Sequence, residues 1–219
     1  MFDPSPSSEP PPQTVAAAPA AGLRLLSWNL LRRVGAEAGD IARLIERHDV
    51  DVALLQEACD RAEDLPKLVG GSFRRSRFPG RAHGPAIWSR AGCRRVRVLP
   101  LAGGATTRRH ALAAEVAGFE FACVHLSHGQ LANRRQARQA AGALAGAAVV
   151  AGDFNMLGPL TLDGFHEVGP REPTHYARGV LPVRIDRCFV RGLACLSARA
   201  LDRGPSDHRP ILLDLARAA

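Results

Sequence analysis

The sequence predicts an α/β protein in which two β-sheets pack face to face and helices cover their outer surfaces. Short runs rich in Val, Leu, Ile and Ala recur along the chain and end in polar residues, as buried strands do. Few segments carry a helical pattern, and many strands with few helices favour packed sheets. The 219 residues, 46% of them hydrophobic, suit one domain with a substantial core.

The N-terminal region differs in composition from the rest of the chain. Residues 1–21 are rich in Pro, Ala and Ser, so we expect a disordered tail before a single domain at 22–219. The tail lacks the basic and apolar pattern of a signal peptide, and no segment is apolar enough over a sufficient length to span a membrane. We therefore expect a cytoplasmic protein.

In the first half of the chain, the apolar runs predict strands at 22–29, 50–57, 85–89 and 95–99. Between the first two, Asp40 is expected to cap a helix whose apolar face carries Ile41, Leu44 and Ile45. Residues 58–83 are polar and basic, and begin with a short helix.

In the second half, residues 111–116 and 119–125 predict a hairpin that turns at Gly118. A helix at 133–147 and a buried strand at 147–155 follow. Residues 156–182 are irregular. Late strands are expected at 183–190 and 211–215, with at least one more between them.

Charge and cysteine content limit the classes of protein. The formal net charge is +8, and arginine supplies nearly all of the positive charge. An arginine-rich surface favours phosphate or nucleic-acid partners, although the Arg and Ala bias of a GC-rich genome would produce the same composition. The five cysteines are scattered, which argues against a disulfide framework or a structural zinc site. A monomer is favoured.

Polar residues stand where the predicted strands end. The most informative are Asp153 and Asn155, which follow a buried strand two residues apart and can therefore point to the same side. Polar groups at the end of a buried strand need partners, so they are a poor choice for packing alone. The other strand-end residues are Asn29, Glu57, His125, Asp207 and His208, and Asp186 lies inside a strand.

These residue types suit attack of water on phosphorus. Glu57, Asp207 and Asn29 offer the hard oxygen ligands that Mg²⁺ or Mn²⁺ prefers. His208 requires a carboxylate to orient it, and Asp186 is the candidate. Asp153 can hold a water, while Asn155 and His125 can contact a phosphoryl oxygen.

The same segments resemble the signature blocks of the endonuclease/exonuclease/phosphatase superfamily, which has the DNase I-like fold. The matching blocks, in order, are residues 27–29, 55–57, 125–126, 152–155, 184–186 and 206–210. The resemblance covers roughly residues 22–215.

The resemblance implies a four-layer α/β/β/α sandwich with one catalytic Mg²⁺ or Mn²⁺. By analogy, Glu57 is the main metal ligand, helped by Asn29 and Asp207. His208 pairs with Asp186, while Asp153, Asn155 and His125 line the scissile phosphate. Family members are described with either the paired His or the Asp of Gly-Asp-x-Asn as general base. We favour His208 as the base or water-orienting group, with Asp153 positioning the same water.

A basic segment at 73–81 is the best candidate for substrate binding. Arg74, Arg75 and Arg77 alternate with Phe residues, a pattern that suits phosphates and stacked bases, although a solvated basic loop has the same composition. His175 lies in a block similar to the family's Pro-Thr block and either touches substrate or forms a turn. We expect a phosphodiester hydrolase that acts on nucleic acid, as an endonuclease or exonuclease.

Other activities remain open at this stage. A phospholipid or sphingomyelin phosphodiesterase is the alternative, but the chain shows no amphipathic or aromatic membrane-inserting loop, so we expect no stable membrane association. An inositol-phosphate phosphatase would require a basic pocket, which this chain could supply. A non-catalytic binding module would usually have lost Glu57, Asp186 or His208, and all three are present.

Overall fold

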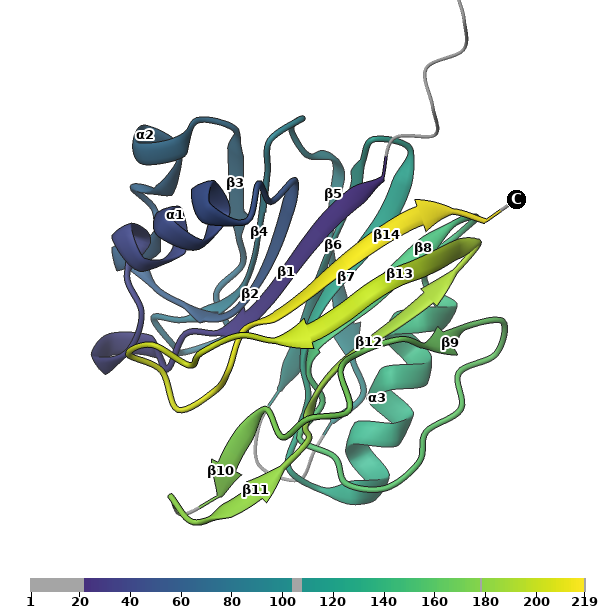
Figure 1. Ribbon diagram of the computed structural model, residues 1–219. Coiled ribbons are helices and arrows are strands. Elements are labelled where there is room, and N and C mark those ends of the chain that lie inside the picture. The colour runs from purple at the N-terminus through teal and green to yellow at the C-terminus, as the bar shows by residue number, and fades with distance from the viewer. Residues whose placement is uncertain (1–21, 104–107, 178, 219) are drawn as a thin grey trace, which may run out of the picture.

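The computed structural model describes residues 22–103, 108–177 and 179–218, and the tail predicted at residues 1–21 lies outside this part of the chain. Two six-stranded sheets form the centre of the molecule (Figure 1). In spatial order, the first sheet contains β13 (Leu193–Ala200), β14 (Ile211–Arg217), β1 (Leu23–Asn29), β2 (Val52–Ala58), β4 (Gly84–Ser89) and β3 (Ser72–Arg75). The second contains β5 (Arg94–Leu101), β6 (Arg109–Val116), β7 (Phe119–His125), β8 (Ala148–Asp153), β12 (Asp186–Arg191) and β9 (His166–Glu167).

The layers follow from where each sheet buries its apolar side chains. Leu25, Leu54, Phe121 and Val149 belong to one cluster that fills the space between the two sheets. Helices α1 (Ala38–Arg47) and α2 (Leu65–Val69) bury their apolar residues against the outer face of the first sheet. Helix α3 (Gln130–Gly142) covers the outer face of the second sheet (Figure 1). The predicted α/β/β/α sandwich is confirmed.

Helix ends are where the sequence predictions were least accurate. The N-cap of α1 is Glu37, and Asp40 lies three residues later, where its carboxylate accepts a hydrogen bond from the Glu37 backbone N–H at 2.9 Å. The prediction of Asp40 as the cap was therefore wrong, because the two acids form a reciprocal capping box. Helix α3 begins at Gln130 and ends at Gly142, earlier at both ends than predicted.

Two segments predicted as irregular contain strands. Residues 58–83 hold the 3₁₀ turn η2 (Asp60–Ala62), helix α2 and the edge strand β3. Residues 156–182 hold β9 and the start of a small hairpin of β10 (His175–Ala177) and β11 (Leu181–Val183), which projects from one end of the molecule (Figure 1). None of the helices in the described residues is long and apolar enough to cross a membrane.

Sheet register brings the polar strand ends together. Strands β7 and β8 run parallel and pair His125 with Asp153, while the antiparallel β8 and β12 pair Asp153 with Asp186. In the first sheet, the parallel β1 and β2 pair Asn29 with Gln56, next to Glu57. These ends meet at one edge of the sandwich.

Candidate active site

Asp153 lies at the centre of the assembled polar residues. Its Oδ2 accepts a hydrogen bond from Asn29 Nδ2 at 3.1 Å and lies 3.5 Å from His125 Nε2 and 3.9 Å from His208 Nε2. Its Oδ1 accepts the backbone N–H of Asn155 at 2.9 Å. Burial raises the pKa of Asp153 to about 7, although the charge of His208 opposes that shift. Four predicted site residues therefore surround the carboxylate of a fifth.

The backbone conformation on both sides of Asp153 is restricted by close contacts and positive φ angles. Gly152 has a φ of 145°, and a Cβ there would lie 2.0 Å from the carbonyl oxygen of Val124. Only glycine permits this close approach of β8 to β7. Asn155 also has a positive φ, 48°, and its side-chain amide donates to the carbonyl of Leu126 at 3.0 Å. The Gly-Asp-Phe-Asn segment is thus held in one conformation.

The predicted pairing of His208 with Asp186 is present. Asp186 Oδ2 lies 2.9 Å from His208 Nδ1, and both side chains are buried. Thr174 Oγ1 accepts the backbone N–H of Asp186 at 3.1 Å, which fixes the start of β12. Burial opposes protonation of His208, but the carboxylates of Asp186 and Asp153 raise its pKa to about 10. The pair therefore favours an imidazolium whose Nε2 faces Asp153.

Glu57 enters the site on a β-bulge. The register between β2 and β4 shifts between Leu55 and Ala58, and Glu57 has a φ of 55°. The bulge directs Gln56 into the space between the sheets, where its Nε2 donates to Ser27 Oγ at 3.2 Å, while Glu57 lines the cavity at the sheet edge. Burial raises the pKa of Glu57, although Arg32, with Nε 3.6 Å from the carboxylate, opposes this.

The donor set fits a divalent cation. Asp207 Oδ1 is buried without a hydrogen-bond partner in the described structure, and Glu57 lines the same cavity. Asn29 is also present, with its Oδ1 accepting the N–H of Leu31 at 3.2 Å. Two carboxylates and an amide suit Mg²⁺ or Mn²⁺. His175, Asp207 and His208 form a second group, with potential ligand atoms within 4.8 Å of one another.

These groups surround one cavity of about 300 Å³, which we call the catalytic cavity. Three arginines also line it: Arg81, the last residue of the segment predicted to bind substrate, and Arg32 and Arg109, which the sequence did not single out. Arg109 is buried and its guanidinium lies 5.0 Å from the ring centre of Phe78, while its Nε has no hydrogen-bond partner among the described residues. No spacing pattern marks Arg32 and Arg109, because they reach the cavity from two separate segments.

Within the segment predicted to bind substrate, Arg74, Arg75 and Arg77 do not line this cavity, although Arg81 does. The guanidinium of Arg75 is almost fully covered and pairs with Asp60 at 2.6 Å and with Glu63. Arg77 also pairs with Asp60, at 3.1 Å, and Arg74 lies on the edge strand β3, where it donates to a backbone carbonyl. His175, the remaining substrate-binding candidate, lies at the cavity beside His208, with ring centres 4.4 Å apart.

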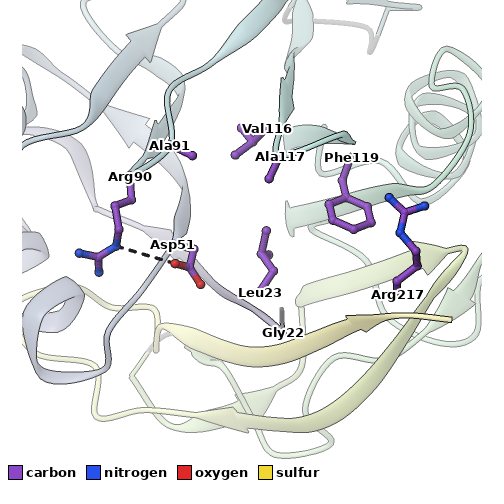
Figure 2. A pocket seen from close by; sticks show the side chains of 9 residues that line it. All are labelled: Gly22, Leu23, Asp51, Arg90, Ala91, Val116, Ala117, Phe119 and Arg217. Atoms are coloured by element: carbon purple, nitrogen blue, oxygen red, sulfur yellow. Dashed lines mark ion pairs between the residues drawn. The ribbon is translucent and has the colours of Figure 1, made fainter. Parts of the chain in front are cut away.

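A separate cavity of about 490 Å³ opens at the opposite end of the sandwich, where β1 begins and β6 turns into β7 (Figure 2). Its charged residues already have partners. Arg90 Nε lies 3.8 Å from Asp51 Oδ1, and the guanidinium of Arg217 lies 4.8 Å from the ring centre of Phe119 (Figure 2). None of the predicted site residues lines this cavity, so the candidate active site is at the other end.

Comparison with known proteins agrees with this geometry. Residues 26–208 match the Endonuclease/Exonuclease/phosphatase family. A solved endonuclease/exonuclease/phosphatase from Bacteroides vulgatus is 20% identical with a TM-score of 0.73, covering 90% of this chain and 100% of that one. One from Beutenbergia cavernae DSM 12333 is 20% identical with a TM-score of 0.70, covering 90% and 72%. D. rerio TDP2 complexed with single strand DNA product is 17% identical with a TM-score of 0.71, covering 89% and 99%. No curated protein matches the sequence.

Proposed function

The chain belongs to the endonuclease/exonuclease/phosphatase family, and from that premise we propose that it hydrolyses phosphodiester bonds in nucleic acid with the help of a divalent metal ion. The observation that carries this proposal is the catalytic cavity, where His208, Asp186, Asp153, His125 and Asn155 converge beside the carboxylates of Glu57 and Asp207. Arginines 32, 81 and 109 supply positive charge at the same place, as a phosphate substrate requires.

We assign the attacking water to the gap between Asp153 Oδ2 and His208 Nε2, which are 3.9 Å apart. Attack forms the new P–O bond, expels the leaving oxygen on the opposite side, and passes one proton of the water to the Asp153–His208 couple. Asp186 holds the imidazole in place and stabilises its charged form. Asn29 and Asn155 orient the carboxylate of Asp153 through their side-chain amides, at 3.1 and 3.3 Å.

Glu57 and Asp207, with Asn29, are the residues we propose to hold Mg²⁺ or Mn²⁺. A cation there would supply Lewis-acid stabilisation of charge on the phosphoryl group. His125 and Arg109 are proposed to contact the phosphoryl oxygens. Burial holds the pKa of His125 well below its ordinary value, so this side chain is neutral and can donate from one ring nitrogen.

The first test is hydrolysis by the purified protein of plasmid DNA, single-stranded RNA and bis-p-nitrophenyl phosphate, each with Mg²⁺, Mn²⁺ or EDTA. We expect metal-dependent cleavage of nucleic acid that Glu57→Ala abolishes while its far-ultraviolet circular dichroism matches wild type. Glu46→Ala, which removes an exposed acid from α1, is the control and should retain full activity. Cleavage that EDTA or Glu57→Ala leaves unchanged would contradict the proposal.

A specific observation favours phospholipid or sphingomyelin as a second candidate substrate. The β10–β11 hairpin exposes the apolar side chains of Tyr176, Val180 and Leu181 and begins at His175, which lines the catalytic cavity. Exposed apolar groups beside a site suit a lipid surface, and the sequence pattern did not indicate this hairpin. Hydrolysis of sphingomyelin vesicles but not of nucleic acid would identify this activity.

A further inference from the structure

A second cavity adjoins the catalytic one. Its volume is about 540 Å³, and it is lined by Arg32, Val34, Cys59, Arg81, Ala82 and His83. We call it the arginine cavity. Arg32 and Arg81 line both cavities, so the two spaces meet at these side chains. A substrate bound at the catalytic cavity can therefore continue directly into the arginine cavity.

The charge of the arginine cavity is positive, and only part of it is compensated, because Arg32 lies 3.6 Å from the carboxylate of Glu57. No carboxylate is among its lining residues. Arg81 is exposed and has no carboxylate within 4.0 Å in the described part of the chain. Arg77, four residues earlier in the same loop, pairs with Asp60 instead. Arg81, an arginine without an acid partner that converges with Arg32 on one cavity, is suited to bind an anionic ligand.

The loop that presents Arg81 is firmly held. Phe78 is buried, its backbone N–H donates to the carbonyl of His83 at 3.0 Å, and its carbonyl accepts from Arg81 at 2.9 Å. At the end of the loop, a Cβ on Gly84 would lie 1.8 Å from the carbonyl oxygen of Ser76, so only glycine allows this close return of the chain. The position of Arg81 beside the catalytic cavity is thus built into the fold.

Arg32, the other arginine of the cavity, is also held in a defined backbone conformation. Arg32 belongs to the 3₁₀ turn η1 (Arg32–Val34), and both Leu31 and Arg32 have positive φ values, 54° and 32°. Such conformations cost energy in residues other than glycine, and they occur where the surrounding structure imposes them. Val34 exposes 77% of its surface next to Arg32, and so offers an apolar face beside a cation.

We propose that the arginine cavity binds the phosphate next to the scissile one, so that the preferred substrate carries at least two consecutive phosphates along a nucleotide chain. The volume of the cavity lies within the range of sites that accept a nucleotide-sized ligand. Arg32 and Arg81 bind the neighbouring phosphate, and Val34 contacts the attached nucleoside. This inference rests on the proposed phosphodiesterase function and adds a substrate class to it.

Thymidine dinucleotides test the proposal because each contains a single diester bond. TpT has only the scissile phosphate, whereas pTpT and TpTp add one neighbouring phosphate on either side. We expect kcat/KM for one of the two phosphorylated forms to exceed that for TpT by about tenfold or more, the usual effect of one charged hydrogen-bonding contact. Arg81→Ala should remove this advantage, and Arg43→Ala, an exposed arginine on α1, should keep it.

Binding distinguishes failure of the subsite from failure of the proposed function. Calorimetric titration of the Glu57→Ala protein should show tighter binding of the preferred phosphorylated dinucleotide than of TpT, and Arg81→Ala in that background should equalise the two. If TpT, pTpT and TpTp are cleaved and bound alike, the subsite is overturned while the hydrolase stands. If the preference in binding persists without any cleavage, the hydrolase function is overturned while the subsite stands.

Discussion

At the residue scale, backbone strain is concentrated at the catalytic cavity. Leu31, Arg32, Glu57 and Asn155 all line it, and all have φ values between 32° and 55°. A left-handed conformation costs about 1–2 kcal/mol in a residue other than glycine. These residues therefore adopt conformations that serve the position of their side chains at the expense of stability, as functional sites often do.

The His208–Asp186 pair should behave as one unit. Each of His208→Ala and Asp186→Asn is expected to lower kcat by about 10²–10⁴-fold, because the imidazole loses either its reacting nitrogen or its orientation. The double variant should be little worse than the poorer single variant. Steady-state kinetics of the three variants tests this prediction, with thermal melting as the check on folding. Losses that multiply in the double variant would show that the two residues act separately.

Gly152, the single glycine of β8, is expected to tolerate no side chain. In Gly152→Ala the new Cβ would lie 2.0 Å from a carbonyl oxygen of β7, so the two strands must move apart. We expect a loss of more than about 3 kcal/mol in the free energy of unfolding. Gly118→Ala is the matched control, since Gly118 also has a positive φ but no atom within 4 Å of the added Cβ, and it should cost about 1–2 kcal/mol. Equal losses in urea denaturation would refute the steric argument.

At the scale of elements, the accuracy of the sequence predictions depended on the local pattern. Strands β7 and β8 were placed closely because runs of buried residues end at a hairpin glycine or at polar residues. The site residues at these ends were identified by the same signal. Strand β3 was missed because it lies at a sheet edge and is rich in arginine, so no apolar alternation marks it. Its arginines were assigned to substrate, but ion pairs with Asp60 and Glu63 occupy one of them.

Long-range contacts explain what the sequence could not indicate. The sequence placed Phe78 in a basic segment suited to stacked bases, but its ring is buried among His83, His110 and Arg109. Arg109 in turn lines the catalytic cavity. The 76–83 loop approaches the start of β6, which lies more than twenty residues further along the chain. Neither the burial of Phe78 nor the place of Arg109 at the cavity can be recognised without this long-range contact.

Phe78 should therefore act as a positioning residue for Arg109. Phe78→Leu keeps an apolar side chain but removes the aromatic face on which the guanidinium lies. We expect kcat/KM for diester hydrolysis to fall by about 2- to 30-fold, corresponding to about 0.5–2 kcal/mol for a cation–π contact, mainly through a higher KM. Phe73→Leu, on the adjoining strand β3, is the control and should leave kinetics unchanged. Identical kinetics for Phe78→Leu and wild type would exclude this role.

At the scale of the whole molecule, opposite ends of the sandwich have different characters. The strand ends at one edge carry the acids, imidazoles and arginines of the two adjoining cavities. At the other end, the charged groups around the separate cavity of about 490 Å³ are paired within the protein (Figure 2). The net charge of +8 is therefore unevenly distributed. Many surface arginines pair with nearby acids, whereas Arg81 and Arg109 at the catalytic cavity have no carboxylate within 4.0 Å in the described part of the chain.

Burial of neutral imidazoles should make the folded state sensitive to acid. His110, the second residue of β6, is buried against Phe78, and burial lowers its pKa, although a hydrogen bond to the backbone of Ser76 opposes that shift. Below about pH 6.5, the ordinary histidine pKa, the unfolded chain binds a proton that folded His110 does not, so stability falls as the pH decreases. The loss from this one group is at most about 1.4 kcal/mol per pH unit and stops at the folded pKa.

His110→Gln isolates this contribution, because the amide can still donate to the Ser76 backbone but cannot titrate. The free energies of unfolding of wild type and variant should differ by a constant amount between pH 7.5 and pH 8.5. From pH 6.5 to pH 5, the difference should shift steadily in favour of the variant, since only wild type carries the protonation penalty. Urea denaturation at half-unit pH intervals measures both ranges, and contributions from the other titrating groups cancel in the difference. A difference that stays constant down to pH 5 would mean that folded His110 binds its proton as readily as the unfolded chain does.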